Sequence, residues 1–402
     1  MARDTKERIL RETLFAFSSL RFEDISLAMI AKRVGVSKTA IFRHFKNKQE
    51  LFDTLETQVL NQILVLRDQL LAIDKSALPE TESRSKVFEV LALFFSEKPE
   101  LLPYLIQRAF NSQSSVATTT LLEVFGTSDI RSVQKCFDMA TMCFFLMQMV
   151  SDYPGDTAMI HQYADSVSLL IEHGFPCFGS ITVQRMEELD SIAEVSAQET
   201  TQDRFFIALG RVLEQYSPLG ISVERVAAEL GLANSTLYAT YANKETLIRQ
   251  TVIKEFLNFG TVLTKRLACA QSLSEAIYVV LATSSSYCAR SIPLSDCIIS
   301  WICMNGKLDC NCDDFERVDF QPRQNPELDR FHEQFQEYCD QENVDSDLIS
   351  RWVMFLPFSF CFMKRLCPEF YPSGYSDESL YRLIQRGVGG ARSDTGDDEM
   401  RA

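Results

Sequence analysis

Glycine and proline are sparse in this sequence, with 15 Gly and 12 Pro among 402 residues. Tight turns draw heavily on these two residues, so the chain cannot supply the many turns of an all-β sandwich or barrel. Hydrophobic residues make up 46% of the sequence, which is typical of folded protein and excludes a disordered or collagen-like chain. We therefore expect an all-α fold with long uninterrupted helices.

Long apolar runs are also missing. The most apolar stretch, residues 136–150, is too short to cross about 30 Å of hydrocarbon, and it contains Asp138 and Gln148. The residues that follow Met1 are charged and polar, without the apolar core of a secretory signal. The expected location is therefore cytoplasmic, with no membrane contact and with the 12 Cys reduced.

Histidine and the usual catalytic motifs are scarce. The four histidines are His44, His161, His173 and His332, and they are scattered along the sequence. The sequence has no glycine-rich phosphate loop and no Gly-x-Ser-x-Gly elbow. We therefore predict a protein that is not an enzyme and needs no cofactor.

The cysteines give a weaker signal. Nine of the 12 lie from Cys269 onward, and Cys310 and Cys312 form a Cys-x-Cys pair not far from Cys303. This spacing fits no closed tetrahedral zinc pattern, so no metal site is predicted. A redox or soft-metal sensor built on Cys303, Cys310 and Cys312 stays open as an alternative.

Positive charge is in deficit, because 40 Lys and Arg stand against 55 Asp and Glu, a net charge of −15. Taken as an average, this balance opposes binding to phosphates. The acidic residues are concentrated, however: residues 309–347 contain 13 acidic residues and three Arg, and we expect them to form a solvated loop and helix face. Residues 1–60 contain 11 basic and 8 acidic residues, so the N-terminal region is basic.

A repeat organises the chain. Residues 5–52 align with residues 201–248 at a constant offset of 196, without a gap; for example, Gly35 matches Gly231. We predict two tandem units, each with a three-helix head and a helical body. The predicted parts are head 1 at 1–52, body 1 at 53–180, a linker at 181–198, head 2 at 199–248, body 2 at 249–388 and a polar tail at 389–402.

Each head has the pattern of a helix-turn-helix. Ser26 and Ser222 are placed to cap a short helix that ends before Gly35 or Gly231, where a sharp turn favours glycine. Ser37 is placed to cap the next helix, the candidate recognition helix. In the second copy, one residue of the pair 233–234 takes that role. The glycines at residues 387–390 are expected to lie in a disordered tail.

The residues from Ile25 to Leu51, with the register Phe42-x-His44-Phe45-x-x-Lys48, resemble the DNA-binding region of TetR-family transcriptional regulators. The resemblance covers three helices and the start of a fourth. Residues 221–247 resemble the same region less closely. The resemblance implies that residues 55–180 and 250–388 are helical ligand-binding and dimerisation bodies, which match by length and position only.

The resemblance also implies the DNA-binding residues of head 1. Lys38 and Thr39 are expected at base edges or nearby phosphates, Phe42 at a sugar or thymine methyl group, and Arg43 in either role. Phosphate contacts are expected from His44 and Lys48, and from the hydroxyls of Ser26 and Ser37, with Lys46 as a further cation. The partner is double-stranded DNA.

Head 2 has lost most of these cations. Asn234 replaces Lys38, Ala239 replaces Arg43, and Lys244 alone remains of the phosphate-binding cations. Residues 197–256 contain 6 basic and 7 acidic residues. Weak DNA binding is therefore predicted for the second head. Its candidate contacts are Asn234, Ser235, Thr236, Tyr238, Thr240 and Lys244.

The bodies complete the prediction. Apolar helices are expected at 84–95, 99–110, 129–150, 157–173, 272–290, 328–340, 347–366 and 377–386.

The predicted function is a ligand-responsive regulator, a repressor, with an unknown small-molecule effector. The two bodies pair within one chain as a pseudo-dimer, or two chains form a homodimer. The alternative is a ligand- or partner-sensing helical protein with little DNA binding.

Overall fold

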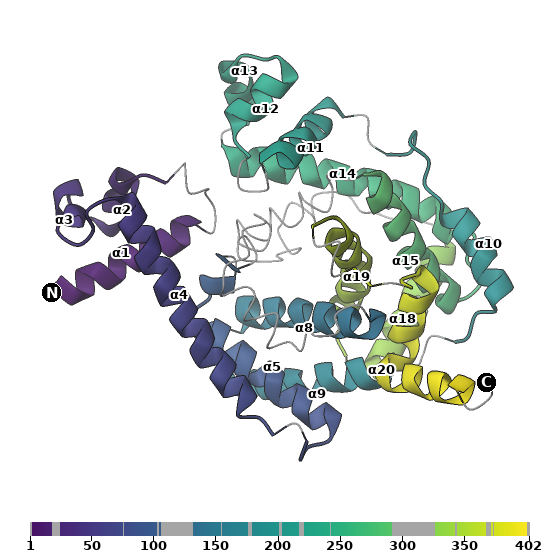
Figure 1. Ribbon diagram of the computed structural model, residues 1–402. Helices are drawn as coiled ribbons and strands as arrows, with labels where there is room; N and C mark the ends of the chain where they lie inside the picture. Colours follow the sequence, from purple (N-terminus) through teal and green to yellow (C-terminus); the bar gives the residue numbers. More distant parts are fainter. Residues whose placement is uncertain are drawn as a thin grey trace.

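The structure is a computed structural model, and in its described residues every regular element is a helix (Figure 1). The all-α prediction is confirmed. No described helix is long and apolar enough to span a bilayer. The structure describes residues 2–17, 25–74, 76–102, 104–105, 132–153, 155–175, 179–200, 203–216, 221–241, 243–291, 326–341, 344–366, 371–372 and 374–399.

The helices fall into two series with the same order. The first series is α1 (Ala2–Phe17), α2 (Leu27–Val34), α3 (Lys38–Phe42), α4 (Lys48–Leu71), α5 (Glu80–Glu97), α8 (Val133–Asp152) and α9 (Thr157–His173). After α10 (Val183–Ala193), the second series is α11 (Arg204–Tyr216), α12 (Val223–Leu230), α13 (Asn234–Thr240), α14 (Lys244–Leu267), α15 (Leu273–Arg290), α18 (Pro326–Gln341), α19 (Ser346–Leu366) and α20 (Asp377–Glu399).

The same local signals begin and end matching helices in the two heads. The Ser26 hydroxyl accepts a hydrogen bond from Met29 N at 3.1 Å, and the Ser222 hydroxyl accepts one from Arg225 N at 3.2 Å. Gly35 and Gly231 end α2 and α12 with φ of 75° and 66°, a region that glycine enters without steric cost. The bounds of α2 and α12, and those of α4 and α14, therefore differ by the offset of 196 found in the sequence.

One predicted cap is absent from head 2. Ala233 precedes α13 in extended conformation and has no side-chain hydrogen bond to the helix, while Asn234 is already the first helical residue. The expectation that residue 233 or 234 caps this helix through its side chain is therefore wrong. Alanine has no side-chain acceptor, and the amide of Asn234 lies one position too late.

Two long helices connect the heads to the bodies. In Figure 1, α4 runs from the head at the left, α14 runs from the head at the top, and both reach the packed helices at the centre and right. Each has 24 residues and begins at an asparagine cap, Asn47 or Asn243. Along α4 a buried stripe at helical spacing faces the protein: Leu51, Leu55, Val59, Ile63, Leu66 and Leu70.

A buried ion-pair cluster joins α5, α8 and α9 of the first body. Arg84 of α5 is 7% exposed and lies 3.3 Å from carboxylate oxygens of both Asp138 on α8 and Glu172 on α9. Burial raises the pKa of Asp138, an effect that the charge of Arg84 partly offsets. Removing one partner of such a cluster would leave a buried charge uncompensated, so the cluster fixes how α5, α8 and α9 pack.

The two bodies meet through four helices. Helices α8 and α9 of the first series pack against α19 and α20 of the second (Figure 1). Trp352 of α19 is fully buried, and its ring centroid lies 6.0 Å from that of Phe137 and 6.4 Å from that of Phe145, both on α8. Its Nε1 donates to Thr141 Oγ1 at 3.1 Å. Large aromatic surfaces therefore hold the two bodies together.

Backbone hydrogen bonds support the same contact. Phe175 N donates to Ile384 O at 2.6 Å, and the Tyr381 hydroxyl donates to Gly179 O at 2.9 Å. Both bonds join the segment after α9 to α20. Since a backbone polar group buried without a partner is costly, these bonds fix the register of the two helices.

The predicted linker contains a helix. Helix α10 buries Met186, Leu189 and Ala193 and packs on α15. Its charged side chains reach the same neighbour, because Arg185 lies 2.9 Å from Glu275 and the Tyr278 hydroxyl donates to Asp190 at 2.8 Å. The polar composition of residues 181–198 therefore includes side chains that pair with α15 as well as side chains that face solvent.

The expectation of a disordered tail at residues 387–390 is wrong. Helix α20 continues to Glu399 across a kink at Gly387, whose φ is 67°. Val388 is 4% exposed. The glycine at 387 allows α20 to approach the backbone of Glu172 and Gly174 so closely that a Cβ atom would overlap both. Glycine here serves close helix packing, which a polar composition does not reveal.

Gly387→Ala is expected to lower the free energy of unfolding by about 2–5 kcal/mol, the combined cost of a left-handed alanine and an overpacked contact. Gly374→Ala is the matched control. Gly374 also has a positive φ, of 90°, but a Cβ there meets nothing within 4 Å, so only about 1–2 kcal/mol is expected. Urea denaturation of both variants measures the difference, and equal losses would show that the contact with α9 is unimportant.

Candidate nucleic-acid interface

The first head is a three-helix unit with a small apolar core. Ile9, Ile30, Ile41 and Phe45 are at most 1% exposed. Two polar contacts fasten α1 to α2: Arg8 Nη2 donates to Val34 O at 2.8 Å, and Arg33 Nε lies 3.2 Å from Glu12 Oε2. These contacts hold the turn and α3 in a fixed orientation.

Helix α3 presents the predicted recognition residues. Ser37 caps the helix by accepting a hydrogen bond from Ala40 N at 3.2 Å. Lys38, Thr39, Phe42 and Arg43 are all exposed, and Phe42 is 46% exposed although it is a large apolar side chain. The Lys38 ammonium lies 5.9 Å from the Phe42 ring centroid. The structure thus places four predicted contacts on one short exposed helix.

The remaining predicted residues of head 1 flank α3. Lys46 is exposed, while His44 and Lys48 are half-buried. The Lys48 ammonium lies 5.9 Å from the Phe52 ring centroid, and the His44 ring is tilted against Phe45. Asn47 accepts from Glu50 N at 2.8 Å and thereby begins α4. Ser26 and Ser37 are exposed while they cap their helices, as predicted.

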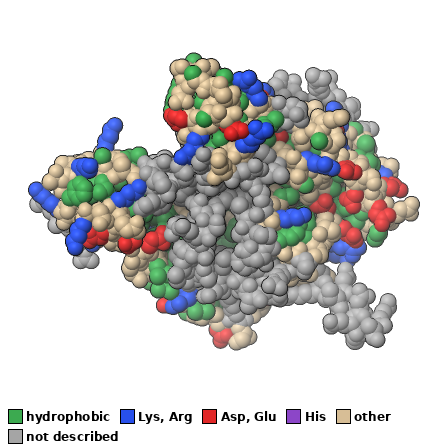
Figure 2. Space-filling model, turned by 45° about the horizontal axis from the view of Figure 1, so that its top comes forward, with side chains coloured by type: hydrophobic (Ala, Val, Ile, Leu, Met, Phe, Trp, Pro, Cys, Tyr) green, Lys and Arg blue, Asp and Glu red, His purple; other side chains and the backbone are tan. Residues whose placement is uncertain are grey.

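The exposed surface of head 1 is rich in Lys and Arg, as its basic sequence predicts. Figure 2 shows Lys and Arg side chains spread over the first head, at the left of the view, around a patch of apolar side chains. The exposed cations here include Lys32, Arg33, Lys38, Arg43 and Lys46. A cationic surface around an exposed aromatic residue suits a ligand that combines anionic and apolar groups.

Head 2 presents a different surface. Asn234, Ser235, Thr236 and Tyr238 are exposed, as the alignment predicts. The Tyr238 hydroxyl donates a hydrogen bond to the Glu224 carboxylate of α12. This bond lowers the pKa of Glu224 and raises the pKa of Tyr238, so the carboxylate stays ionised beside the recognition helix. The side chains of Thr240 and Lys244 lie outside the described residues.

Sequence reasoning missed Glu224 as a residue of this surface. Its counterpart in head 1 is Ala28, so the alignment showed a new acidic side chain at the first turn of α12. The Arg211 guanidinium lies 3.0 Å from Glu229, another acidic residue on α12. Head 2 therefore combines fewer cations with added carboxylates, which opposes binding to phosphate.

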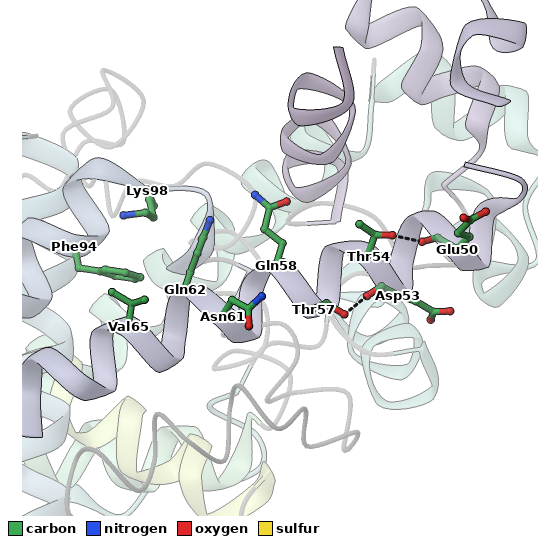
Figure 3. A pocket seen from close by; sticks show the side chains of 10 residues that line it. All are labelled: Glu50, Asp53, Thr54, Thr57, Gln58, Asn61, Gln62, Val65, Phe94 and Lys98. Atoms are coloured by element: carbon green, nitrogen blue, oxygen red, sulfur yellow. Dashed lines mark hydrogen bonds between the residues drawn. The ribbon is translucent and has the colours of Figure 1, made fainter. Parts of the chain in front are cut away.

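Two cavities are lined by residues of α4 or of the bodies rather than by α3. One, of about 770 Å³, follows the exposed side of α4 below head 1. Figure 3 shows Gln58, Asn61 and Gln62 along α4, with Val65, Phe94 and Lys98 grouped at one end of the cavity. The Lys98 ammonium lies 4.4 Å from the Phe94 ring centroid. A ligand here would contact the helix that connects head 1 to its body.

The second cavity, of about 630 Å³, lies where the two bodies meet. Aromatic side chains from both series line it, including Phe145, Tyr153, Tyr163 and Tyr338. Sequence reasoning did not find either cavity. The first follows α4 and is completed by Phe94 and Lys98, whereas the second combines residues from both series.

The predicted thiol residues Cys303, Cys310 and Cys312 lie outside the described part of the chain. Among the described residues, no group of three or more His, Cys, Asp or Glu side chains is arranged to hold a metal ion. The cysteines of the described part form no disulfide with one another: Cys136, Cys143, Cys269, Cys288, Cys339 and Cys361.

Comparison with known proteins identifies the first head. Residues 9–55 match the family described as "Bacterial regulatory proteins, tetR family". Similar curated proteins are the nucleoid occlusion factors SlmA of Citrobacter koseri and Klebsiella pneumoniae subsp. pneumoniae, each 33% identical over 97 residues. That alignment covers 24% of this chain and 47% of each relative, so the chain spans about half the length of the curated relatives it matches.

The matched residues extend from within α1 to the first turns of α4 and include the whole helix-turn-helix. They contain Ser26, Ser37 and the exposed residues of α3. The resemblance drawn from residues 25–51 is confirmed, because residues 9–55 of this chain match the family described as "Bacterial regulatory proteins, tetR family".

Proposed function

We propose that this protein is a ligand-responsive DNA-binding transcriptional regulator, and that it acts as a repressor in which head 1 is the main reader of DNA. The observation that carries the proposal is the exposure of Lys38, Thr39, Phe42 and Arg43 on α3 of a tetR-type domain. A helix that enters the major groove needs side chains of this kind pointing away from its own core.

The residues of head 1 divide by role. Lys38 and Thr39 read base edges, Phe42 packs on a sugar or thymine methyl group, and Arg43 reaches a base or phosphate. Lys46, His44 and Lys48 flank α3 and bind phosphates, together with the hydroxyls of Ser26 and Ser37. The first group sets sequence preference, while the second sets affinity and its dependence on salt.

Head 2 contributes less to the binding of DNA. Its exposed Asn234, Ser235, Thr236 and Tyr238 can form hydrogen bonds, and Thr240 and Lys244 complete the set that the alignment assigns. The ionised carboxylate of Glu224 beside Tyr238 opposes a nearby phosphate. The proposed operator is therefore asymmetric, with one strong half-site.

Restoring cations to head 2 should strengthen it. Asn234→Lys with Ala239→Arg places cations at the positions that match Lys38 and Arg43. We expect tighter binding to a DNA fragment that carries two copies of the strong half-site. The slope of log K against log salt should grow by about 0.9 for each phosphate gained. Fluorescence anisotropy over a salt series measures both effects, and an unchanged slope would mean that head 2 lies away from DNA.

We infer further that the two bodies form a pseudo-dimer within one chain. Helices α8 and α9 pack against α19 and α20, and each pair consists of the last two helices of its series. The repeated bounds of α2 and α12 and of α4 and α14 support an origin by tandem fusion. A homodimer through α8 and α9 would have to displace α19 and α20, because those helices already cover this surface.

The stoichiometry on DNA tests this assembly. A random-oligonucleotide selection at low salt supplies the operator, and light scattering with footprinting then gives mass and symmetry. One chain on an asymmetric site supports the pseudo-dimer, with two heads spaced for half-sites about 34–36 Å apart. Two chains on a palindrome would show that the homodimer is the functional form.

The same selection separates the alternative function. If no sequence is enriched, the protein is a ligand- or partner-sensing helical protein that scarcely uses DNA. The loss of cations from head 2 already favours this alternative for the second half of the chain.

The proposed effector site is the α4 cavity, because a ligand at Gln58, Asn61 and Gln62 contacts the helix that positions head 1.

A further inference from the structure

A third cavity, of about 840 Å³, lies in the second body. Its walls come from α10, α15, α19 and the segment that leads into α20. Cys288 of α15 and Cys361 of α19 both line it, and so does Lys364, one turn after Cys361. The cavity therefore exposes two thiols from different helices to small solutes.

The two thiols lie close together on packed helices. Cys361 Sγ donates a weak hydrogen bond to Ser285 O of α15 at 3.9 Å, one turn before Cys288, and α15 packs against α19. Cys288 is 4% exposed, whereas Cys361 is partly exposed toward the cavity. Both thiols thus line the cavity, and Cys361 is the more accessible of the two. A reactive cysteine with a resolving partner needs this arrangement.

The surroundings make the two thiols unequal. The hydrogen bond from Cys288, together with the charge of Lys364, lowers the pKa of Cys361. Burial raises the pKa of Cys288, as it does for Cys136 and Cys143, whose pKa values rise to about 11. Burial and the carboxylate of Asp377 act in the opposite direction and raise the pKa of Cys361.

We propose that Cys361 and Cys288 form a peroxide-reactive dithiol site in the second body, with Cys361 as the nucleophile and Cys288 as the resolving thiol. The Cys361 thiolate attacks one oxygen of hydrogen peroxide, breaks the O–O bond and becomes a sulfenic acid, while the other oxygen leaves as water after taking up a proton. The Cys288 thiol then attacks the oxidised sulfur, and the hydroxyl group leaves with the Cys288 proton as a second water.

The product is a disulfide between α15 and α19. One disulfide replaces two thiols and one peroxide becomes two waters, so no further oxidant is needed. The reaction belongs to this cavity and does not depend on DNA binding. Because α19 also packs on α8, the new bond joins α15 covalently to a helix of the contact between the two bodies.

The test uses the full chain treated with hydrogen peroxide, followed by peptide mass spectrometry. In the wild-type protein a Cys288–Cys361 disulfide should be the first to form, and Cys361 should be lost at least about 10-fold faster than Cys143. In Cys288→Ser, dimedone should trap a sulfenic acid on Cys361. In Cys361→Ser, Cys288 should stay reduced. Cys269→Ser, at an exposed position, should leave the disulfide yield unchanged.

Three results would overturn the proposal. The first is loss of Cys361 no faster than that of Cys143. The second is a disulfide between Cys361 and a cysteine other than Cys288. The third is the absence of a dimedone adduct on Cys361 in Cys288→Ser. The wild-type measurement needs no substitution, so the outcome stands even where a variant folds poorly.

Discussion

Lys38→Ala combined with Arg43→Ala is expected to lower the affinity for the selected operator by about 100-fold or more. Both side chains are exposed, so the loss reflects DNA contacts rather than unfolding. A base contact contributes about 1–3 kcal/mol, and each lost phosphate contact reduces the salt slope by about 0.9. Fluorescence anisotropy at several salt concentrations measures the affinity and the slope together.

A control with the same change in charge makes this result specific. Lys86→Ala with Lys265→Ala also removes two exposed cations, but from α5 and α14, away from α3. This pair should change operator affinity by less than about twofold at moderate salt, because distant charges are screened. Equal losses from the two double variants would mean that α3 does not read DNA and that only the net charge matters.

The heads could be predicted from sequence because their signals are local. Ser26 and Ser37 cap helices within three residues, and Gly35 ends α2 through its own backbone conformation. None of these features needs information from a distant part of the chain. The family resemblance rests on the same residues, and it is confirmed where the signals are strongest, in residues 9–55.

Features that depend on distant contacts were predicted poorly. The composition around Gly387 suggested disorder, yet its lack of a side chain allows contact with the backbone of Glu172 on another helix. The polar segment 181–198 contains α10 because Met186, Leu189 and Ala193 on one side of this helix pack against α15. In both places the composition of the segment alone does not show which distant helix the segment packs against.

The cysteines illustrate the same limit. Spacing in the sequence drew attention to Cys310 and Cys312, which lie outside the described residues. Cys288 and Cys361 are far apart in the sequence, and neither stands in a recognisable motif. Only the packing of α15 against α19 brings these two thiols to the same cavity.

Trp352→Ala is expected to lower the free energy of unfolding by about 3–5 kcal/mol, because it leaves a cavity between the bodies and removes the donor to Thr141. Urea unfolding should then separate into two transitions, since weaker contact uncouples the halves. Phe259→Ala is the control: Phe259 is 1% exposed, but it belongs to the core around head 2 and α14. That variant should be destabilised to a similar extent while the contact between α8 and α19 stays intact. A loss below about 1 kcal/mol for Trp352→Ala, or two transitions only in Phe259→Ala, would place the coupling of the two halves elsewhere.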